Sequence, residues 1–194
     1  MDPCFVDVTL EFLAVAFHSI LFYTRIYHEN IFEMRRKYNF VVYHCFHPEV
    51  NRYIDMCLKS IAECLKSDTM QRIEFATTDE EYKPLIKFVF DFEKNFTFDD
   101  TSDAYLINCE QNLRAFCLKL SSMVHRFVNL PENKSFTIFI HTNESTVVNI
   151  STNPDLEEFP LVEVDFKQKE AETIIPIRRL TIRNHNIDTY IEFI

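Results

Sequence analysis

The chain has 194 residues, a net charge of −10 and no glycine. The length suits one domain, and the acidic charge argues against direct binding to nucleic acid, which requires clustered lysine and arginine. Glycine-rich phosphate loops, the dinucleotide fingerprint and the G-x-S-x-G nucleophile turn all need glycine, so we expect no cofactor held by such motifs.

A long first helix is predicted from about Phe5 to Tyr27. Apart from one narrow polar stripe it is apolar on every side, and such a helix is normally buried at the centre of a fold. The chain begins with acidic residues where a secretory signal would be basic. The apolar stretch from Phe12 to Tyr23 is too short to span a bilayer. We therefore expect neither export nor contact with a membrane.

The middle of the chain predicts two more helices and three strands. A short extended segment around Tyr38 to Tyr43 precedes a helix that begins at Pro48, a residue suited to the first helical position. "RIEFATT" and "PLIKFVFDF" alternate as strands joined by a hairpin loop. A third helix starts within Asp99 to Asp103, and "SFTIFIHT" is a third strand. This order indicates an α+β fold, in which three helices pack on a small antiparallel sheet.

Residues 143–194 differ in character from residues 1–142. Three prolines and a run of acidic residues punctuate them, and short strands are predicted at 179–183 and 187–193. The closing stretch "TIIPIRRLTIRNHNIDTYIEFI" is as apolar as a core strand, although chain termini are usually polar. We therefore expect this tail to pack against the rest of the domain.

No metal site or catalytic constellation is predicted. His44, Cys45 and His47 form one cluster, but a structural zinc site needs four ligands and no second pair is evident. The six cysteines have no C-x-x-C spacing, and four of them (Cys57, Cys64, Cys109 and Cys117) lie on or beside apolar helix faces. That placement favours inert core thiols, so a thiol-dependent enzyme is only a remote alternative.

Arg114 lies on the polar side of the third predicted helix, one turn before an exposed Leu118. A solvated surface arginine is the simplest interpretation. Arginine is also over-represented among the residues that dominate interfaces. The residues alone leave both interpretations open.

Several segments, in order, resemble the HORMA-domain family: "EFLAVAFHSILFYTRIY", "IFEMRRKYN", "HPEVNRYI", "IKFVF" and "LRAFCLK". Within that family they are similar to the accessory subunits of the translesion DNA polymerase zeta. The resemblance implies a single HORMA domain that is not an enzyme. Residues 1–142 would be its core and residues 143–194 a "safety belt", which crosses the sheet and pins an extended peptide of a partner.

The resemblance also implies two partner sites. Tyr53 matches a tyrosine that contacts the peptide motif of the polymerase's catalytic subunit, and Leu161 stands where the family usually has tryptophan. Ile174, Asp188 and Tyr190 match positions that bind the C-terminal domain of an inserter polymerase. Asp188 replaces the usual glutamine there.

By the same resemblance, Arg114 matches an arginine at the face where two HORMA domains dimerise. The expected function is that of an adaptor in translesion DNA synthesis, which bridges the catalytic subunit to an inserter polymerase. The expected compartment is the nucleus, with the cytoplasm as a second location. The alternative within the fold is a spindle-checkpoint or meiotic HORMA adaptor that binds other peptides.

Overall fold

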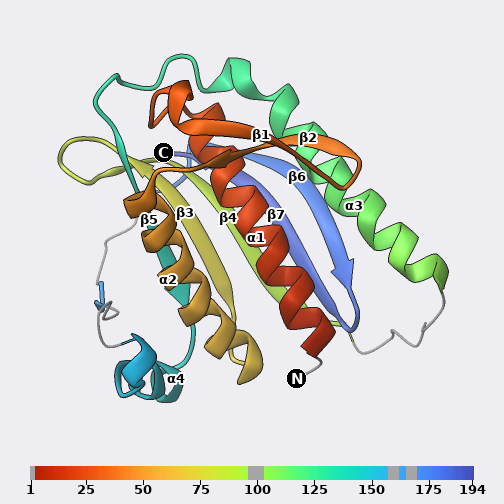
Figure 1. The fold of residues 1–194 in the computed structure, drawn as a ribbon. Coiled ribbons are helices and arrows are strands. Elements are labelled where there is room, and N and C mark those ends of the chain that lie inside the picture. Colours follow the sequence, from red (N-terminus) through yellow and green to blue (C-terminus); the bar gives the residue numbers. More distant parts are fainter. Residues whose placement is uncertain (1–2, 96–102, 157–161, 165–169) are drawn as a thin grey trace.

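The computed structural model describes residues 3–95, 103–156, 162–164 and 170–194 and has the predicted α+β architecture (Figure 1). Three helices cover one face of a five-stranded antiparallel sheet: α1 (Pro3–Tyr23), α2 (Pro48–Lys66) and α3 (Asp103–Ser122). The strands of this sheet are β3 (Arg72–Thr78), β4 (Pro84–Lys94), β5 (Ser135–His141), β6 (Thr173–Ile182) and β7 (His185–Phe193). Three short 3-10 helices connect elements: η1 (Glu29–Ile31), η2 (Val124–Arg126) and η3 (Pro154–Leu156).

Helix α1 is the centre of the core. It lies across the middle of the sheet, with α2 and α3 on either side (Figure 1). Phe12 contacts Phe90 and Phe116 edge-on, while Phe17 contacts Phe75 and Phe90. By length and composition alone α1 is apolar enough to cross a membrane. Phe5, Phe12, Leu13, Phe17, Ile20 and Leu21 of this helix are instead fully buried in the core, as predicted for a central helix.

The apolar tail is explained by its place in the sheet. The strand order is β5-β3-β4-β7-β6, so the C-terminal hairpin of β6 and β7 pairs with β4. Phe88 lies opposite Ile191, and Leu180, Ile187 and Ile191 are fully buried in the main core. The tail strands are therefore core strands, and they are longer than the sequence pattern predicts.

Two elements were missing from the prediction. Residues 32–45 form a hairpin of β1 (Phe32–Lys37) and β2 (Phe40–Cys45), where one extended segment was expected. Strand β1 is largely exposed, so it shows no apolar alternation. The tail also contains a fourth helix, α4 (Glu144–Ser151), which buries only Thr146 and Ile150 and therefore has no strong helical period. The three helices predicted on the sheet are thus confirmed, and α4 is a further helix in the tail.

The absence of glycine affects the turns. Among the described residues, six have positive φ: Arg25, Tyr38, Asn39, Asp68, Tyr82 and Arg183. Tyr38 and Asn39 are adjacent between β1 and β2, and two consecutive positive φ values are typical of a type I′ hairpin turn. Each such residue costs roughly 1–2 kcal/mol because its Cβ crowds the following carbonyl oxygen. Helix α1 accordingly ends before Arg25, four residues earlier than predicted.

Candidate functional site

The sheet has two edges, and they differ in how they are protected. At one edge, β6 contains Pro176, which lacks an N–H donor, and an irregularity between Pro176 and Arg178. Helix α3 packs on this strand, and Asn112 accepts hydrogen bonds from the Arg178 guanidinium. At the other edge, no strand in the described part of the chain pairs with the outer side of β5. Proline and irregular pairing block strand addition, so β5 is the edge that can accept a further strand.

The register shows which backbone groups of β5 are available. Gln71 N donates to His141 O at 3.0 Å, so the backbone of His141 faces β3. Neighbouring residues of a strand direct their N–H and C=O groups to opposite sides. The residues that face away from β3 are therefore Phe136, Ile138 and Ile140. They form a row of donors and acceptors along the edge.

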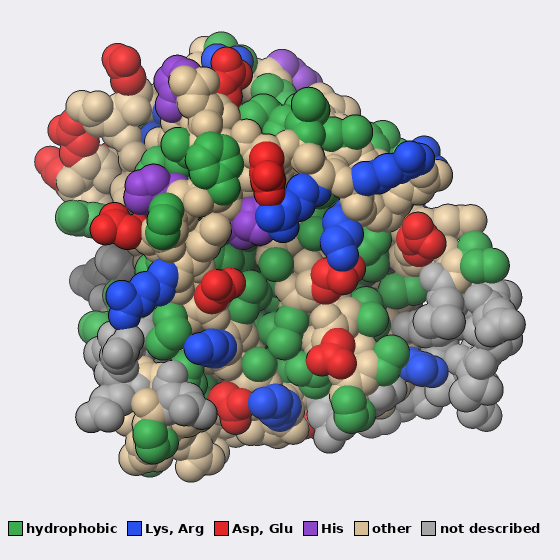
Figure 2. Space-filling model, viewed as in Figure 1, with side chains coloured by type: hydrophobic (Ala, Val, Ile, Leu, Met, Phe, Trp, Pro, Cys, Tyr) green, Lys and Arg blue, Asp and Glu red, His purple; other side chains and the backbone are tan. Residues whose placement is uncertain are grey.

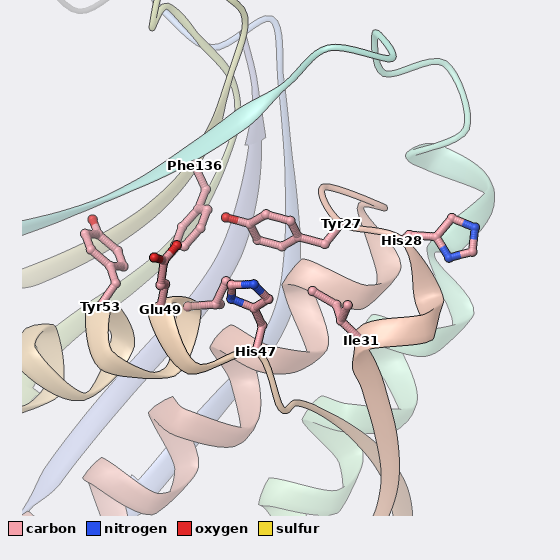
Figure 3. A pocket seen from close by; sticks show the side chains of 8 residues that line it. Tyr27, His28, Ile31, His47, Glu49, Tyr53 and Phe136 are labelled. Atoms are coloured by element: carbon pink, nitrogen blue, oxygen red, sulfur yellow. The ribbon is translucent and has the colours of Figure 1, made fainter.

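A groove of about 480 Å³ lies beside this row, between β5, η1 and the start of α2 (Figure 3). In the close-up view the Tyr53 and Glu49 side chains rise from α2 towards Phe136 of β5, and Tyr27 reaches in from the loop that follows α1. The lining is mainly aromatic and aliphatic, with Glu49 as its one carboxylate among the described residues: Tyr27, His28, Ile31, His47, Glu49, Val50, Tyr53 and Phe136. This size and lining suit an apolar side chain of a ligand.

Tyr53, which the resemblance assigns to peptide binding, is part of the groove wall. Its ring meets Phe136 edge-on, with centroids 5.2 Å apart. Its Oη accepts a hydrogen bond of 3.4 Å from Ile138 N, one of the outward-facing donors of β5. Burial is the main cause that raises the pKa of the Tyr53 hydroxyl, which therefore stays protonated at any physiological pH. Its role in binding remains a prediction, and Leu161, predicted beside it, lies outside the described residues.

The three residues predicted to bind an inserter polymerase share one face of the C-terminal hairpin. Asp188 and Tyr190 are two residues apart on β7, and Ile174 pairs with the next residue of that face, Glu192. Buried Ile187 and Ile191 point to the helices, so the predicted trio lies on the opposite face of the sheet. Ile174 is 58% exposed. The structure thus brings the three together, while their function remains a prediction.

Charged residues of β3, β4 and β5 also lie on this side of the sheet, and the sequence pattern did not predict their contacts. Glu74 is almost fully buried, with Lys87 Nζ 2.9 Å from one carboxylate oxygen and His141 Nε2 3.2 Å from the other. Burial alone would raise the pKa of Glu74, but the contacts with His141 and Lys87 outweigh it and lower the pKa to about 2. These contacts join β3, β4 and β5. Such partners come together only through strand register, which sequence spacing does not reveal.

Arg114 and Leu118 are both exposed on α3, and no ion pair of Arg114 occurs within the described ranges. This placement fits a solvated arginine and an interface arginine equally, so the predicted dimer contact stays a prediction. Figure 2, viewed from the helix side, shows lysine and arginine side chains interspersed with acidic and apolar ones, without a continuous basic stripe on that face.

The histidine and cysteine side chains described next have environments typical of structural rather than catalytic residues. The His18 ring stacks on His44 at 4.1 Å, and His44 Nδ1 lies 2.6 Å from Cys45 O. In the part of the chain that the structure describes, no group of three or more histidine, cysteine or acidic residues is placed to hold a metal ion. Burial raises the pKa of both Cys57 and Cys117 to about 12. Thiols this hard to ionise are poor nucleophiles.

Comparison with models of known protein families finds no match. Among curated proteins, the mitotic spindle assembly checkpoint protein MAD2B of Homo sapiens is 32% identical over 188 residues, which cover 96% of this chain and 89% of that protein. DNA polymerase zeta subunit 2 of Drosophila melanogaster is 27% identical over 166 residues, covering 85% of this chain and 83% of that protein.

Solved structures show the same fold at lower sequence identity. A chain in the crystal structure of the mitotic checkpoint complex superposes with a TM-score of 0.80 at 19% identity, covering 97% of this chain and 98% of that chain. The structure of C. elegans HTP-2 bound to HTP-3 closure motif 1 gives a TM-score of 0.76 at 9% identity, covering 97% and 85%. Similarity at these identities demonstrates a shared architecture.

Proposed function

This chain belongs to the HORMA-domain family, close to the accessory subunits of DNA polymerase zeta, and we propose that it is the non-catalytic adaptor subunit of that polymerase in translesion synthesis. In this role it binds an extended peptide of the catalytic subunit along the outer edge of β5. The observation that supports this most strongly is the outward-facing backbone of Phe136, Ile138 and Ile140 beside an aromatic groove. The structure of HTP-2 with a closure motif is a second support, since it records a peptide motif on a similar fold.

Strand addition explains how such an edge would bind. Backbone hydrogen bonds to β5 provide affinity for any extended chain, while a pocket for alternate side chains provides specificity. The groove lies on the helix side of β5, next to Tyr53 and Phe136. A partner residue whose side chain turns to that side enters the groove, and its neighbours turn away. We therefore expect an apolar residue at every second position of the bound segment.

The positions of β5 and β6 support a closing role for residues 143–172. Strand β5 ends beside Arg72, whereas β6 begins opposite Phe193, at the other end and the other edge of the sheet. Thr146 and Ile150 of α4 are buried, and Thr146 Oγ1 lies 2.9 Å from Thr69 Oγ1. Helix α4 therefore fixes the start of this segment to the core. In the proposed complex, the segment beyond α4 closes over the bound peptide as a belt.

The remaining partners are proposed from the family resemblance. The face that carries Ile174, Asp188 and Tyr190 contacts the C-terminal domain of an inserter polymerase, and Arg114 with Leu118 forms a face for a second HORMA domain. The protein would act in the nucleus, and any DNA would be held by its partners. The name of the human relative, a spindle assembly checkpoint protein, supports a second candidate in which the same β5 edge binds a checkpoint partner.

Peptide binding tests the proposal. Overlapping peptides tiled across the catalytic subunit of DNA polymerase zeta from the same genome should include one that binds, measured by calorimetry. Methylating its backbone nitrogens one at a time should weaken binding at every second position, because only alternate amides of an added strand face β5. If no tiled peptide binds, the polymerase assignment fails. Binding of peptides tiled from spindle-checkpoint proteins would then support the second candidate.

A further inference from the structure

Tyr53 occupies a backbone donor that a bound strand would need. Ile138 N–H points away from β3 and donates to Tyr53 Oη, with 3.4 Å between nitrogen and oxygen. Most N–H···O bonds are about 2.9–3.0 Å long. This hydrogen bond is therefore weak, and a better acceptor could replace it at little cost.

The hydroxyl also lies where a partner's backbone would lie. In a paired strand the neighbouring carbonyl oxygen sits about 2.9 Å from the amide nitrogen, with strand axes about 4.8 Å apart. A carbonyl at that distance from Ile138 N and the hydroxyl at 3.4 Å would overlap, since both approach the same N–H. A strand that pairs with the full edge must displace the Tyr53 hydroxyl.

The Tyr53 ring can move towards the open groove. It comes from the second turn of α2, contacts Phe136 edge-on, and forms one wall of the open groove (Figure 3). We propose that Tyr53 gates the β5 edge: its hydroxyl caps Ile138 in the unoccupied chain and swings aside when a partner strand binds, so that the ring then packs on the partner. This inference rests on the proposed function, because it needs a partner that pairs with β5.

Two substitutions distinguish the contribution of the Tyr53 hydroxyl from that of the Tyr53 ring. Tyr53→Phe removes the competing oxygen and retains the aromatic wall, whereas Tyr53→Ala removes both. Tyr82→Phe is the control, because Tyr82 is 70% exposed and does not line the groove. The probe is the tightest-binding peptide from the polymerase tiling, labelled for stopped-flow measurement of its association rate.

Tyr53→Phe should raise the association rate about two- to fivefold, the lower part of the range for losing one neutral hydrogen bond. Tyr82→Phe should leave the rate unchanged, and Tyr53→Ala should speed dissociation. In the peptide-free protein, Tyr53→Phe should shift the Ile138 amide resonance and leave the resonances of Thr137 and Phe139 in place.

An unaltered association rate together with an unaltered Ile138 resonance in Tyr53→Phe would overturn the gate, even if the peptide binds. A peptide series that binds no variant would overturn the proposed function, and the gate with it. The two failures are distinct, because the Ile138 resonance is measured without any ligand.

Discussion

The hydroxyl of Tyr190 donates to Asp91 Oδ2 at 2.7 Å, which joins the C-terminal hairpin to the central strand β4. The Arg72 guanidinium binds the same carboxylate from β3, with Nη2 3.0 Å from Oδ2. One polar chain thus crosses three strands on the face opposite the helices. Because its hydroxyl is already used, Tyr190 would present its ring to a partner, so its role in the fold and its proposed role in binding are separable.

Tyr190→Phe should lower the free energy of unfolding by about 1–2 kcal/mol, the range for a hydrogen bond to a charged group, reduced here by partial exposure. The ring, and with it the proposed contact with an inserter polymerase, should remain. Urea unfolding measures the first effect, and pull-down of the inserter's C-terminal domain measures the second. Tyr82→Phe is the control, because Tyr82 is 70% exposed. Equal stabilities of the Tyr190 and Tyr82 variants would show that the bond to Asp91 contributes nothing.

Truncation is a poor substitute for this point variant. Deleting residues 184–194 would remove β7, whose Ile187 and Ile191 are fully buried, and would leave β6 without its partner strand. The central strand β4 would become an edge with exposed Phe88 and Phe90. Such a loss of core would destabilise the whole domain, so a loss of binding could come from unfolding as well as from the missing contact.

Acidification should destabilise the fold through His18. Burial is the main cause that lowers its pKa from 6.5 to about 3, and the neighbouring His44 and Arg35 contribute to the same shift. Below pH 6.5 the unfolded chain takes up a proton that folded His18 does not, so stability is present above pH 6.5 and falls as pH drops towards 3. From pH 7.5 to 5.5 the free energy of unfolding should fall by about 1.4 kcal/mol from this one group.

The comparison is with His18→Gln, whose amide oxygen can still accept a hydrogen bond from Cys45 N, as His18 Nδ1 does at 3.3 Å. Urea unfolding at the two pH values should show a smaller loss for the variant. If both proteins lose the same amount, His18 is not the group responsible.

The strained loop between β3 and β4 predicts a stabilising substitution. Tyr82 has φ of 61° and an exposed side chain, so replacing it removes little packing. Tyr82→Gly should raise the free energy of unfolding by about 0.5–1 kcal/mol, because relief of roughly 1–2 kcal/mol of strain exceeds the added flexibility of glycine in the unfolded chain. Tyr82→Ala retains a Cβ and should give no such gain. Thermal unfolding of both variants measures the difference, and a Gly variant no more stable than the Ala variant would exclude strain as the cause.

Thiol labelling distinguishes an adaptor from a thiol-dependent enzyme. Burial raises the pKa of Cys57 and Cys117 to about 12, and Cys45, Cys64 and Cys109 are also buried. At pH 7.5 iodoacetamide should label Cys4 first, because it is the one cysteine that is only partly buried. The others should react only after unfolding. Mass mapping that finds one of the buried five labelled fastest in the native protein would revive the enzyme alternative.

The sequence predicted those parts of the fold that rest on apolar periodicity. The helices around Phe12, Ile54 and Phe116 and the strands around Phe75 and Phe88 all have such a pattern, and all are core elements. The hairpin of β1 and β2 escaped prediction because its first strand is mostly exposed. Helix α4 escaped because it is short and buries few side chains.

The site could be predicted only in part. Tyr53 was assigned by resemblance, yet its neighbours Tyr27 and Phe136 lie far from it in the sequence and meet it only because β5 runs beside α2. Which backbone groups of β5 point outward depends on the register of β5 against β3. A slip of one residue in that register would turn every outward-facing group inward, and the sequence pattern does not define the register.

Amide hydrogen exchange along β5, with and without the bound polymerase peptide, tests the central proposal most directly. In the free protein the amides of Phe136, Ile138 and Ile140 should exchange faster than those of Thr137, Phe139 and His141, which face β3. On binding, the first three should become protected and the other three should hardly change, because an added strand supplies acceptors to the outer edge, where Ile138 N otherwise has only the long 3.4 Å hydrogen bond to Tyr53 Oη. Protection that is absent from Phe136, Ile138 and Ile140 while the peptide is demonstrably bound would contradict strand addition at β5.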